Sequence, residues 1–93
     1  MADKKPQWLT YGEGYADVTL SRPLKVDGVD VVTLRMREPT VNDQLAVAET
    51  KGTEAKKEVN YFANLCDMSP NDLQTLPIRD FARLQAAYTG FID

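Results

Sequence analysis

The stretch Val18–Leu45, VTLSRPLKVDGVDVVTLRMREPTVNDQL, decides the fold of this chain. On either side of Asp27-Gly28, apolar residues alternate with polar ones, a period of two that is typical of strands with one buried face. The residues of the two expected apolar faces are Val18, Leu20, Leu24 and Val26 before the turn, and Val32, Leu34 and Met36 after it. The pattern therefore predicts a β-hairpin over residues 17–37.

The register of this hairpin depends on the length of its turn. A two-residue turn at Asp27-Gly28 would place Leu20 opposite Arg35, so that an apolar face would meet a polar one. We therefore expect a three-residue loop from Val26 to Gly28, with Gly28 left-handed in a bulge. The pairs that follow from this loop are Val18 with Met36 and Leu20 with Leu34.

After the hairpin, start and stop signals for helices follow one another closely. Pro39 disfavours a helical conformation in the residue before it, and Thr40 with Asp43 forms a capping box that opens a helix. The other candidate caps and stops are Gly52, Thr53, Ser69, Pro77 and Gly90. The expected helices cover about residues 41–51, 54–67, 70–75 and 77–90. The fold class is therefore α+β, with an N-terminal β-hairpin followed by three or four short helices.

Residues 1–16 lie outside these elements. This segment mixes Pro6, Gly12 and Gly14 with aromatic residues, a composition that favours an extended or irregular arm of low intrinsic order over a helix. No linker, repeat or low-complexity tract divides the rest of the chain. We therefore expect residues 17–93 to form a single α+β domain that carries this arm.

Charge and composition disfavour several classes of partner. The net charge is −3, and residues 41–93 hold eight acidic against five basic side chains, whereas residues 1–40 hold six of each. An acidic helical half works against binding to nucleic-acid phosphates and, for the same reason, to anionic membranes. No apolar run approaches the roughly 20 residues of a membrane span, and no signal-peptide pattern follows the N-terminal lysines. With Cys66 as the single cysteine, these features predict a protein of a reducing cytoplasm.

Reactive side chains are scarce. Histidine is absent, which removes the commonest acid-base group near neutral pH and the commonest metal ligand. Cys66 lies on the apolar face of an expected helix and is interpreted as a small buried hydrophobe. Arg35 and Arg37 are interpreted as solvated side chains paired with Glu38 or Asp30, not as an anion site. We therefore expect no catalytic residue, no cofactor and no metal site, and interpret the protein as non-enzymatic.

The expected helices carry more apolar surface than so small a domain readily encloses. A domain of this size buries only about 60–65% of the surface of its unfolded chain. Part of the aromatic surface is expected to form the core, and the rest is expected to contact another polypeptide. The candidate partner-binding residues are Trp8, Tyr11, Tyr61, Leu65, Phe81, Leu84, Tyr88 and Phe91.

Two groups of short motifs stand in a fixed order along the chain. The first has Leu-x-x-Pro-Leu at residues 20–24, the Asp-Gly turn, and Arg-x-Pro-Thr at residues 37–40. The second lies within NLCDMSPNDLQTLPIRDFARLQ, residues 64–85, with Ser-Pro-x-Asp-Leu and Asp-Phe-x-x-Leu-Gln. In these motifs and their spacing, residues 18–92 resemble the tail assembly chaperones of contractile-tailed phages such as Mu and P2.

The resemblance implies a role in virion assembly. A chaperone of this family would bind the long tape-measure protein, keep it soluble and help tail-tube subunits gather around it in the host bacterial cytoplasm. It would be absent from the mature virion. The family also often makes a longer product by ribosomal frameshifting, so a longer form of the chain itself is a further expected partner, as is a second copy in a homo-oligomer.

Other functions remain open from the residues alone. A small structural component of the phage tail would use similar elements, and its presence in purified particles would identify it. A nucleic-acid-binding regulator could place a helix of this size in a groove, although residues 54–67 offer only two lysines against three acids. An antitoxin or inhibitor that binds a protein would need the same small acidic scaffold. The resemblance ranks the chaperone above these alternatives.

Overall fold

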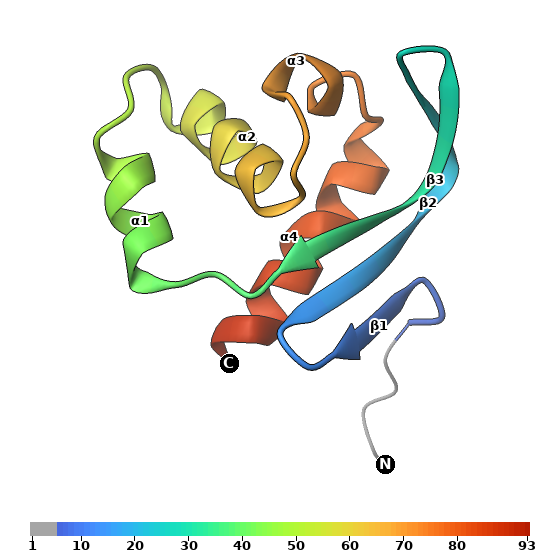
Figure 1. Ribbon diagram of the computed structural model, residues 1–93, viewed down its shortest axis with the longest axis horizontal. Coiled ribbons are helices and arrows are strands. Elements are labelled where there is room, and N and C mark those ends of the chain that lie inside the picture. Colours follow the sequence, from blue (N-terminus) through green and yellow to red (C-terminus); the bar gives the residue numbers. More distant parts are fainter. Residues whose placement is uncertain (1–5) are drawn as a thin grey trace.

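The computed structural model describes residues 6–93, in which three strands precede four helices (Figure 1). The elements are β1 (Leu9–Gly12), β2 (Tyr15–Val26), β3 (Val29–Arg37), α1 (Val41–Ala48), α2 (Glu54–Leu65), α3 (Pro70–Leu73) and α4 (Ile78–Ile92). The strands form one antiparallel sheet in the order β1-β2-β3, and α4 packs against β2. The α+β class and the order of hairpin before helices are confirmed.

The segment that was expected to be an extended or irregular arm contains a strand. β1 pairs with β2, with Leu9 opposite Val18, through a tight turn in which Gly14 has a φ of +84°. Leu9–Gly12 is thus extended and joins the sheet, because the edge of β2 offers backbone partners that composition alone does not reveal. Residues 1–5 of the expected arm lie outside the described residues.

The hairpin between β2 and β3 turns in two residues, not three. Asp27 and Gly28 both have positive φ, 52° and 81°, as a type I′ turn requires, and Val26 pairs with Val29. The predicted three-residue loop and its bulge at Gly28 are wrong. The pairs predicted from them are also wrong, because Val18 lies opposite Leu34 and Ala16 lies opposite Met36.

An irregularity inside β2 removes the mismatch that had argued against the short turn. The register shifts between Thr19 and Leu24, so that residues 20–23 of β2 lie opposite Val32 alone. The extra residues place Leu24 opposite Val31, so that Leu24 and the partly buried Val31 pack on the core, whereas Val32, expected on the apolar face, is 53% exposed. A bulge of this kind changes the pairing of two strands partway along, so a search for one constant register misses it.

α4 provides hydrogen-bond partners for the backbone that the bulge leaves unpaired. Asp80 is fully buried and accepts hydrogen bonds from the backbone N–H of Ser21 at 2.9 Å and from its Oγ at 3.0 Å. Arg83 donates to the carbonyl oxygen of Thr19 at 2.7 Å and lies over the ring of Trp8, 5.0 Å from its centroid. The first turns of α4 therefore hold the irregular part of β2 in place.

Three helices begin where their capping residues predict. The hydroxyl of Thr40 accepts from the N–H of Asp43, whose carboxylate accepts in return from the N–H of Thr40, so the predicted capping box is present. Thr53 caps α2 and Ser69 caps α3 in the same side-chain-to-backbone manner. These helices end two or three residues before the expected positions, within the usual uncertainty of helix ends.

The last helix continues past its predicted stop. Gly90 was expected to end the helix, yet α4 runs to Ile92. A Cβ at position 90 would collide with the hydroxyl of Tyr11, which donates a hydrogen bond to the carbonyl oxygen of Ala87 at 2.9 Å. Glycine is therefore needed here for the close approach of β1, not for a left-handed cap.

The core lies between the sheet and the helices. Its largest fully buried apolar side chains come from β2, β3 and all helices except α1, and they are Val18, Met36, Phe62, Leu65, Leu73 and Leu84. By contrast, α1 buries only the polar residue Asp43. Val41 is 73% exposed and Leu45 is 59% exposed, so the apolar face of α1 lies at the surface of the domain and not in its core.

Candidate protein-binding surface

The eight predicted partner-binding residues fall into two classes. Leu65 and Leu84 belong to the core, with exposed fractions of 2% and 0%. The other six are half-buried, with one part of each ring against the core and another part at the surface, and they are Trp8, Tyr11, Tyr61, Phe81, Tyr88 and Phe91. Of the eight predicted residues, only these six are more than marginally exposed.

Three of the six gather around Phe62 at the contact between α2 and α4. The ring of Tyr61 meets that of Tyr88 edge to face with centroids 5.5 Å apart, and their hydroxyls lie 3.3 Å from each other. Phe62 lies beneath them, 5.5 Å from Tyr88 and 5.4 Å from Phe81. Burial raises the pKa of the Tyr61 hydroxyl well above its ordinary value. The arrangement gives a rigid aromatic surface with neutral polar tips.

The other three lie where β1 meets α4. Tyr11 and Phe91 form an edge-to-face pair with centroids 5.2 Å apart, and Trp8 is covered by the guanidinium of Arg83. The hydroxyl of Tyr11 is anchored to α4 through Ala87. These contacts hold β1 against α4. The structural role of this attachment falls to Trp8, Tyr11 and Phe91, whether or not they also contact a partner.

An open groove runs between α1, α2 and α4. Its main part has a volume of about 570 Å³, and a smaller part of about 180 Å³ continues toward the start of α1 and the end of α4. Tyr61 and Tyr88 line both parts. We call this surface the aromatic groove, and its apolar lining comprises Val41, Val47, Ala48, Ala55, Tyr61, Phe62, Tyr88 and Ile92.

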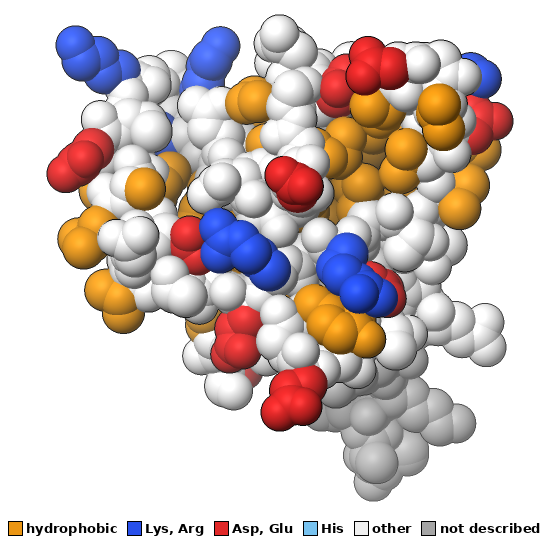
Figure 2. Space-filling model, viewed as in Figure 1, with side chains coloured by type: hydrophobic (Ala, Val, Ile, Leu, Met, Phe, Trp, Pro, Cys, Tyr) orange, Lys and Arg blue, Asp and Glu red, His pale blue; other side chains and the backbone are white. Residues whose placement is uncertain are grey.

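Sequence reasoning missed the contribution of α1 to this surface. Val41 is 73% exposed and Ile92 is 61% exposed, and both line the groove. Leu45, one turn along from Val41, is 59% exposed. The spacing of Val41, Leu45 and Ala48 was a recognisable apolar stripe, but a stripe alone does not tell whether it faces the core or another chain. Figure 2 shows hydrophobic side chains at the surface in the region of α1.

One ion pair fixes the position of α1. The two terminal nitrogens of Arg37 donate to the two carboxylate oxygens of Asp43 at 2.7 and 2.9 Å. The same carboxylate accepts from the backbone N–H and the hydroxyl of Thr40. These hydrogen bonds, that of Arg37 above all, hold the pKa of Asp43 well below its ordinary value. The arginine at the end of β3 thus joins the capping box of α1 to the sheet.

The predicted ionic partners of the two arginines were wrong, although their interpretation as paired side chains is confirmed. Arg37 pairs with Asp43, and Arg35 donates to both oxygens of Asp17 at 2.8 and 3.0 Å while its guanidinium lies over the ring of Tyr15. Asp17 faces Arg35 across the β2–β3 ladder, which the incorrect register had hidden. Opposite charges on paired positions of neighbouring strands stabilise a sheet.

Replacing Asp43 with asparagine should remove a pH-dependent part of the stability. Because the folded-state pKa of Asp43 is depressed, its carboxylate stabilises the fold fully above the ordinary pKa of about 4, and this contribution is lost as the pH falls from there toward the lower folded-state pKa. Urea unfolding should therefore find wild type more stable than Asp43→Asn at about pH 6. The difference should shrink steadily toward about pH 2. A constant difference over this range would contradict the assigned role of the carboxylate.

The groups with the greatest potential for chemistry are buried or paired. Burial raises the pKa of the Cys66 thiol to about 12, as expected of a small buried hydrophobe. Among residues 6–93, no group of three or more Cys, Asp or Glu side chains is arranged to hold a metal ion. Within the same residues, none of the helices combines the length and the apolar character needed to cross a bilayer.

Comparison with known proteins identifies one family. Residues 17–93 match the family model described as "Phage tail assembly chaperone proteins, E, or 41 or 14". The match extends from β2 to the last residue and includes every motif on which the resemblance was based. No curated protein and no solved structure matches the chain.

Proposed function

The chain belongs to the phage tail assembly chaperone family, and on this premise we propose that it binds the tape-measure protein, keeps that protein soluble and assists assembly of the tail tube. The observation that carries the proposal is the aromatic groove with the exposed apolar stripe of α1 at its border. The family is one of assembly chaperones and not a known class of enzyme. We propose no reaction for this chain.

The groove is suited to an amphipathic helix of the client. A long helical protein exposes apolar stripes until its partners cover them, and a helix commonly docks by placing such a stripe in a groove lined by apolar side chains. Here the lining includes Tyr61 and Tyr88 together with Val41 on α1 and Ile92 on α4. We therefore assign the client contact to these residues and to the half-buried Phe81. Leu65 and Leu84 are not part of the proposed contact, because they are buried in the core.

The charges around the groove support solubility of a complex. Glu54, Lys57 and Glu58 lie on the rim contributed by α2, and the amide of Gln85 on α4 donates to Glu58 at 3.2 Å. A polar rim around an apolar centre keeps a protein surface hydrated while the centre is covered by a partner.

The remaining parts of the proposal concern the assembly pathway. We propose that the chain acts in the host bacterial cytoplasm and leaves the tail before the virion is complete. A longer form produced by frameshifting would share residues of this domain and add a segment that reaches the tail-tube protein. Homo-oligomers of the chain would hold several grooves along one client. Mass spectrometry of infected cells and of purified particles tests these statements directly, and detection of the chain in mature particles would contradict the second of them.

A charge placed in the groove should abolish client protection. Val41→Asp puts a carboxylate at an exposed position of the groove wall, where the domain itself loses no packed core side chain. Loss of a buried valine contact of about 1.5–3 kcal/mol corresponds to a loss of client affinity of about ten-fold or more. The tape-measure protein should be co-expressed with each variant, and the soluble fraction of the client should fall several-fold with Val41→Asp.

Ile78→Asp is the matched control. Ile78 is 84% exposed and is the first residue of α4, as Val41 is the first residue of α1, but it does not line the aromatic groove. Both substitutions add one negative charge at a helix N-terminus, where an acid is favourable. Client solubility should stay at the wild-type level with Ile78→Asp. If folded Val41→Asp protects the client as well as wild type does, the groove is not the client site.

A further inference from the structure

One edge of the sheet has no partner strand among residues 6–93. β3 is the last strand in the order β1-β2-β3. The N–H of Glu38 donates to the carbonyl oxygen of Gly14 at 3.0 Å, and backbone groups alternate in direction along an antiparallel strand. The N–H of Thr19 donates to the carbonyl oxygen of Trp8, the residue before β1, so this N–H is not bonded to Thr33, the partner of Thr19 on β3. The backbone groups that point away from β2 are therefore those of Thr33, Arg35 and Arg37.

A groove of about 770 Å³ lies along this open edge. Its apolar lining comes from the hairpin on one side and from the end of α2 and the following turn on the other, and consists of Val26, Val31, Leu34, Leu65, Cys66 and Met68. Thr33, Arg35 and Arg37 also line it. In Figure 2 a hollow with hydrophobic side chains lies in the region between the β2–β3 hairpin and α3. Unpaired backbone groups and an apolar floor thus stand side by side. We call this surface the edge groove.

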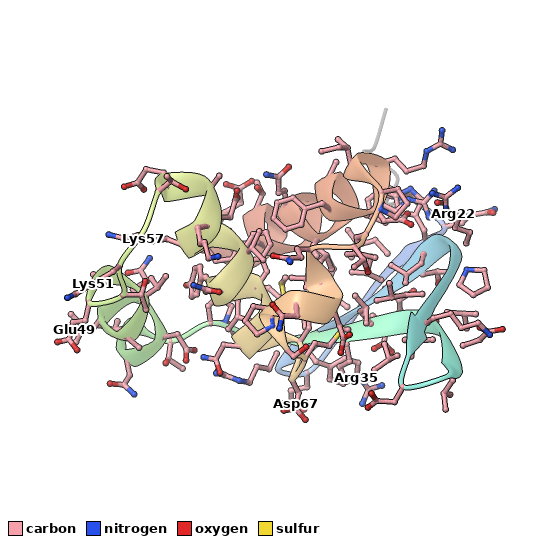
Figure 3. The ribbon with its side chains drawn as sticks, turned by 90° about the horizontal axis from the view of Figure 1, so that it is seen from above. Arg22, Arg35, Glu49, Lys51, Lys57 and Asp67 are labelled. Atoms are coloured by element: carbon pink, nitrogen blue, oxygen red, sulfur yellow. The ribbon has the colours of Figure 1, made fainter. Side chains whose placement is uncertain are left out.

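The uncompensated charge of the edge groove is negative. Arg35 and Arg37 are each neutralised by a carboxylate of the same domain, Asp17 and Asp43. Asp67, at the end of α2, lines the groove and takes part in none of the ion pairs formed among the described residues. Figure 3 shows Arg35 and Asp67 extending from the same side of the molecule. A cationic side chain of an occupant would therefore find its counter-charge at Asp67.

We propose that the edge groove is a second docking site, which takes up an extended segment of a partner protein as a fourth strand beside β3. Main-chain hydrogen bonds to Thr33 and Arg35 would hold the segment, and alternate apolar side chains would enter the hollow. A lysine or arginine near the end of the segment would meet Asp67. A second copy of this chain fits less well, because pairing two β3 edges would bring the acidic groups of both grooves together.

This site is distinct from the aromatic groove. The two grooves share no lining residue, and they favour different client conformations, a helix in one and a strand in the other. The proposal therefore does not rest on tape-measure binding. A chaperone with both sites could hold a helical segment and an extended segment at once, which raises the effective concentration of each.

The probe for the edge groove is a synthetic ten-residue peptide in which valine alternates with threonine and a lysine stands at each end. Hydrogen exchange of the wild-type protein, followed by NMR, should show slower exchange at the amides of Thr33 and Arg35 when the peptide is added. A copy of the peptide N-methylated at the amides that would face β3 cannot form the ladder and should bind about ten-fold more weakly. A copy with glutamate in place of lysine should also bind more weakly.

Variants of the edge distinguish backbone pairing from simple adhesion. Thr33→Pro removes an N–H that β2 does not use and should lower peptide affinity about ten-fold, whereas Thr33→Ala keeps this N–H and should bind as wild type does. Asp67→Asn removes the charge at a position with a φ of +56°, which asparagine tolerates, and should abolish the preference for lysine.

Three outcomes would overturn the proposal. The first is equal binding of the N-methylated and unmethylated peptides to wild type. The second is protection of amides elsewhere than on β3, a result that stays informative even if Thr33→Pro fails to fold. The third is a dimer of wild type that is lost in Thr33→Pro but kept in Thr33→Ala, which would assign the edge to a second copy. None of these outcomes affects the comparison of Val41→Asp with Ile78→Asp.

Discussion

Replacing Asp80 with alanine should lower the free energy of unfolding by about 3 kcal/mol, a large part of the stability of so small a domain. The carboxylate of Asp80 is fully buried and is the acceptor for both the N–H and the hydroxyl of Ser21. Alanine would remove both hydrogen bonds that hold the bulge of β2 to α4, and a hydrogen bond to a charged group contributes about 1.5–3 kcal/mol. Urea unfolding of wild type and Asp80→Ala measures the loss.

Two control variants, Asp80→Asn and Asp72→Ala, should lose less stability than Asp80→Ala. Asparagine keeps one acceptor oxygen for the N–H of Ser21 and should recover part of the lost stability. Asp72 accepts from the hydroxyl of Ser69 at an exposed helix cap, so its replacement by alanine should cost about 1 kcal/mol or less. Equal losses in Asp80→Ala and Asp72→Ala would show that the bulge does not depend on α4.

Replacing Gly90 with alanine should destabilise the protein by about 2 kcal/mol, although alanine is the better helix former by about 1 kcal/mol. The added methyl group would occupy the position of the Tyr11 hydroxyl, so the ring must move away. Its hydrogen bond to Ala87 and its edge-to-face contact with Phe91 would then be lost. Thermal and urea unfolding of Gly90→Ala provide the test.

A double-mutant cycle separates this collision from any effect on the helix itself. Tyr11→Leu removes the ring, and in that background Gly90→Ala should be neutral or stabilising, because only helix propensity remains. The sign of the Gly90→Ala effect should therefore reverse between wild type and Tyr11→Leu. Destabilisation of equal size in both backgrounds would mean that Gly90 is required by the local conformation of α4.

The motifs that carry the family resemblance lie mostly at joints of the fold. Leu-x-x-Pro-Leu at residues 20–24 spans the bulge, and Asp80 of Asp-Phe-x-x-Leu-Gln is the acceptor that satisfies it. Arg-x-Pro-Thr at residues 37–40 contains the arginine and the cap that hold α1, and Ser-Pro-x-Asp-Leu begins α3. These motifs thus identify a scaffold, while the exposed residues proposed to bind partners, such as Val41 and Thr33, lie outside the family motifs or between them.

The candidate site could be predicted only in part. Aromatic residues beyond the needs of one helical stripe indicated a protein-binding surface, and six of the eight proposed residues do reach the surface. Leu65 and Leu84 could not be separated from them, because a helix that packs on two neighbours has two buried flanks. Val41 was not among the candidate residues, although it lies at the surface and lines the aromatic groove. The open edge of β3 depends on strand order and register. The sequence pattern predicted neither β1 nor the observed register of the hairpin.

By itself, the sequence determined those features that depend on neighbouring residues. Side-chain caps, proline and the local period of hydrophobicity act within a few positions, so the α+β class, the order of the elements and the starts of three helices followed from the chain. Only the tertiary structure decided the register of the hairpin, the strand β1 and the reason for Gly90. Each of these features depends on a contact between segments that are distant in the sequence. The contacts are those of Ser21 with Asp80, Leu9 with Val18 and Tyr11 with Gly90. Local sequence patterns do not reveal such contacts, because they depend only on neighbouring residues.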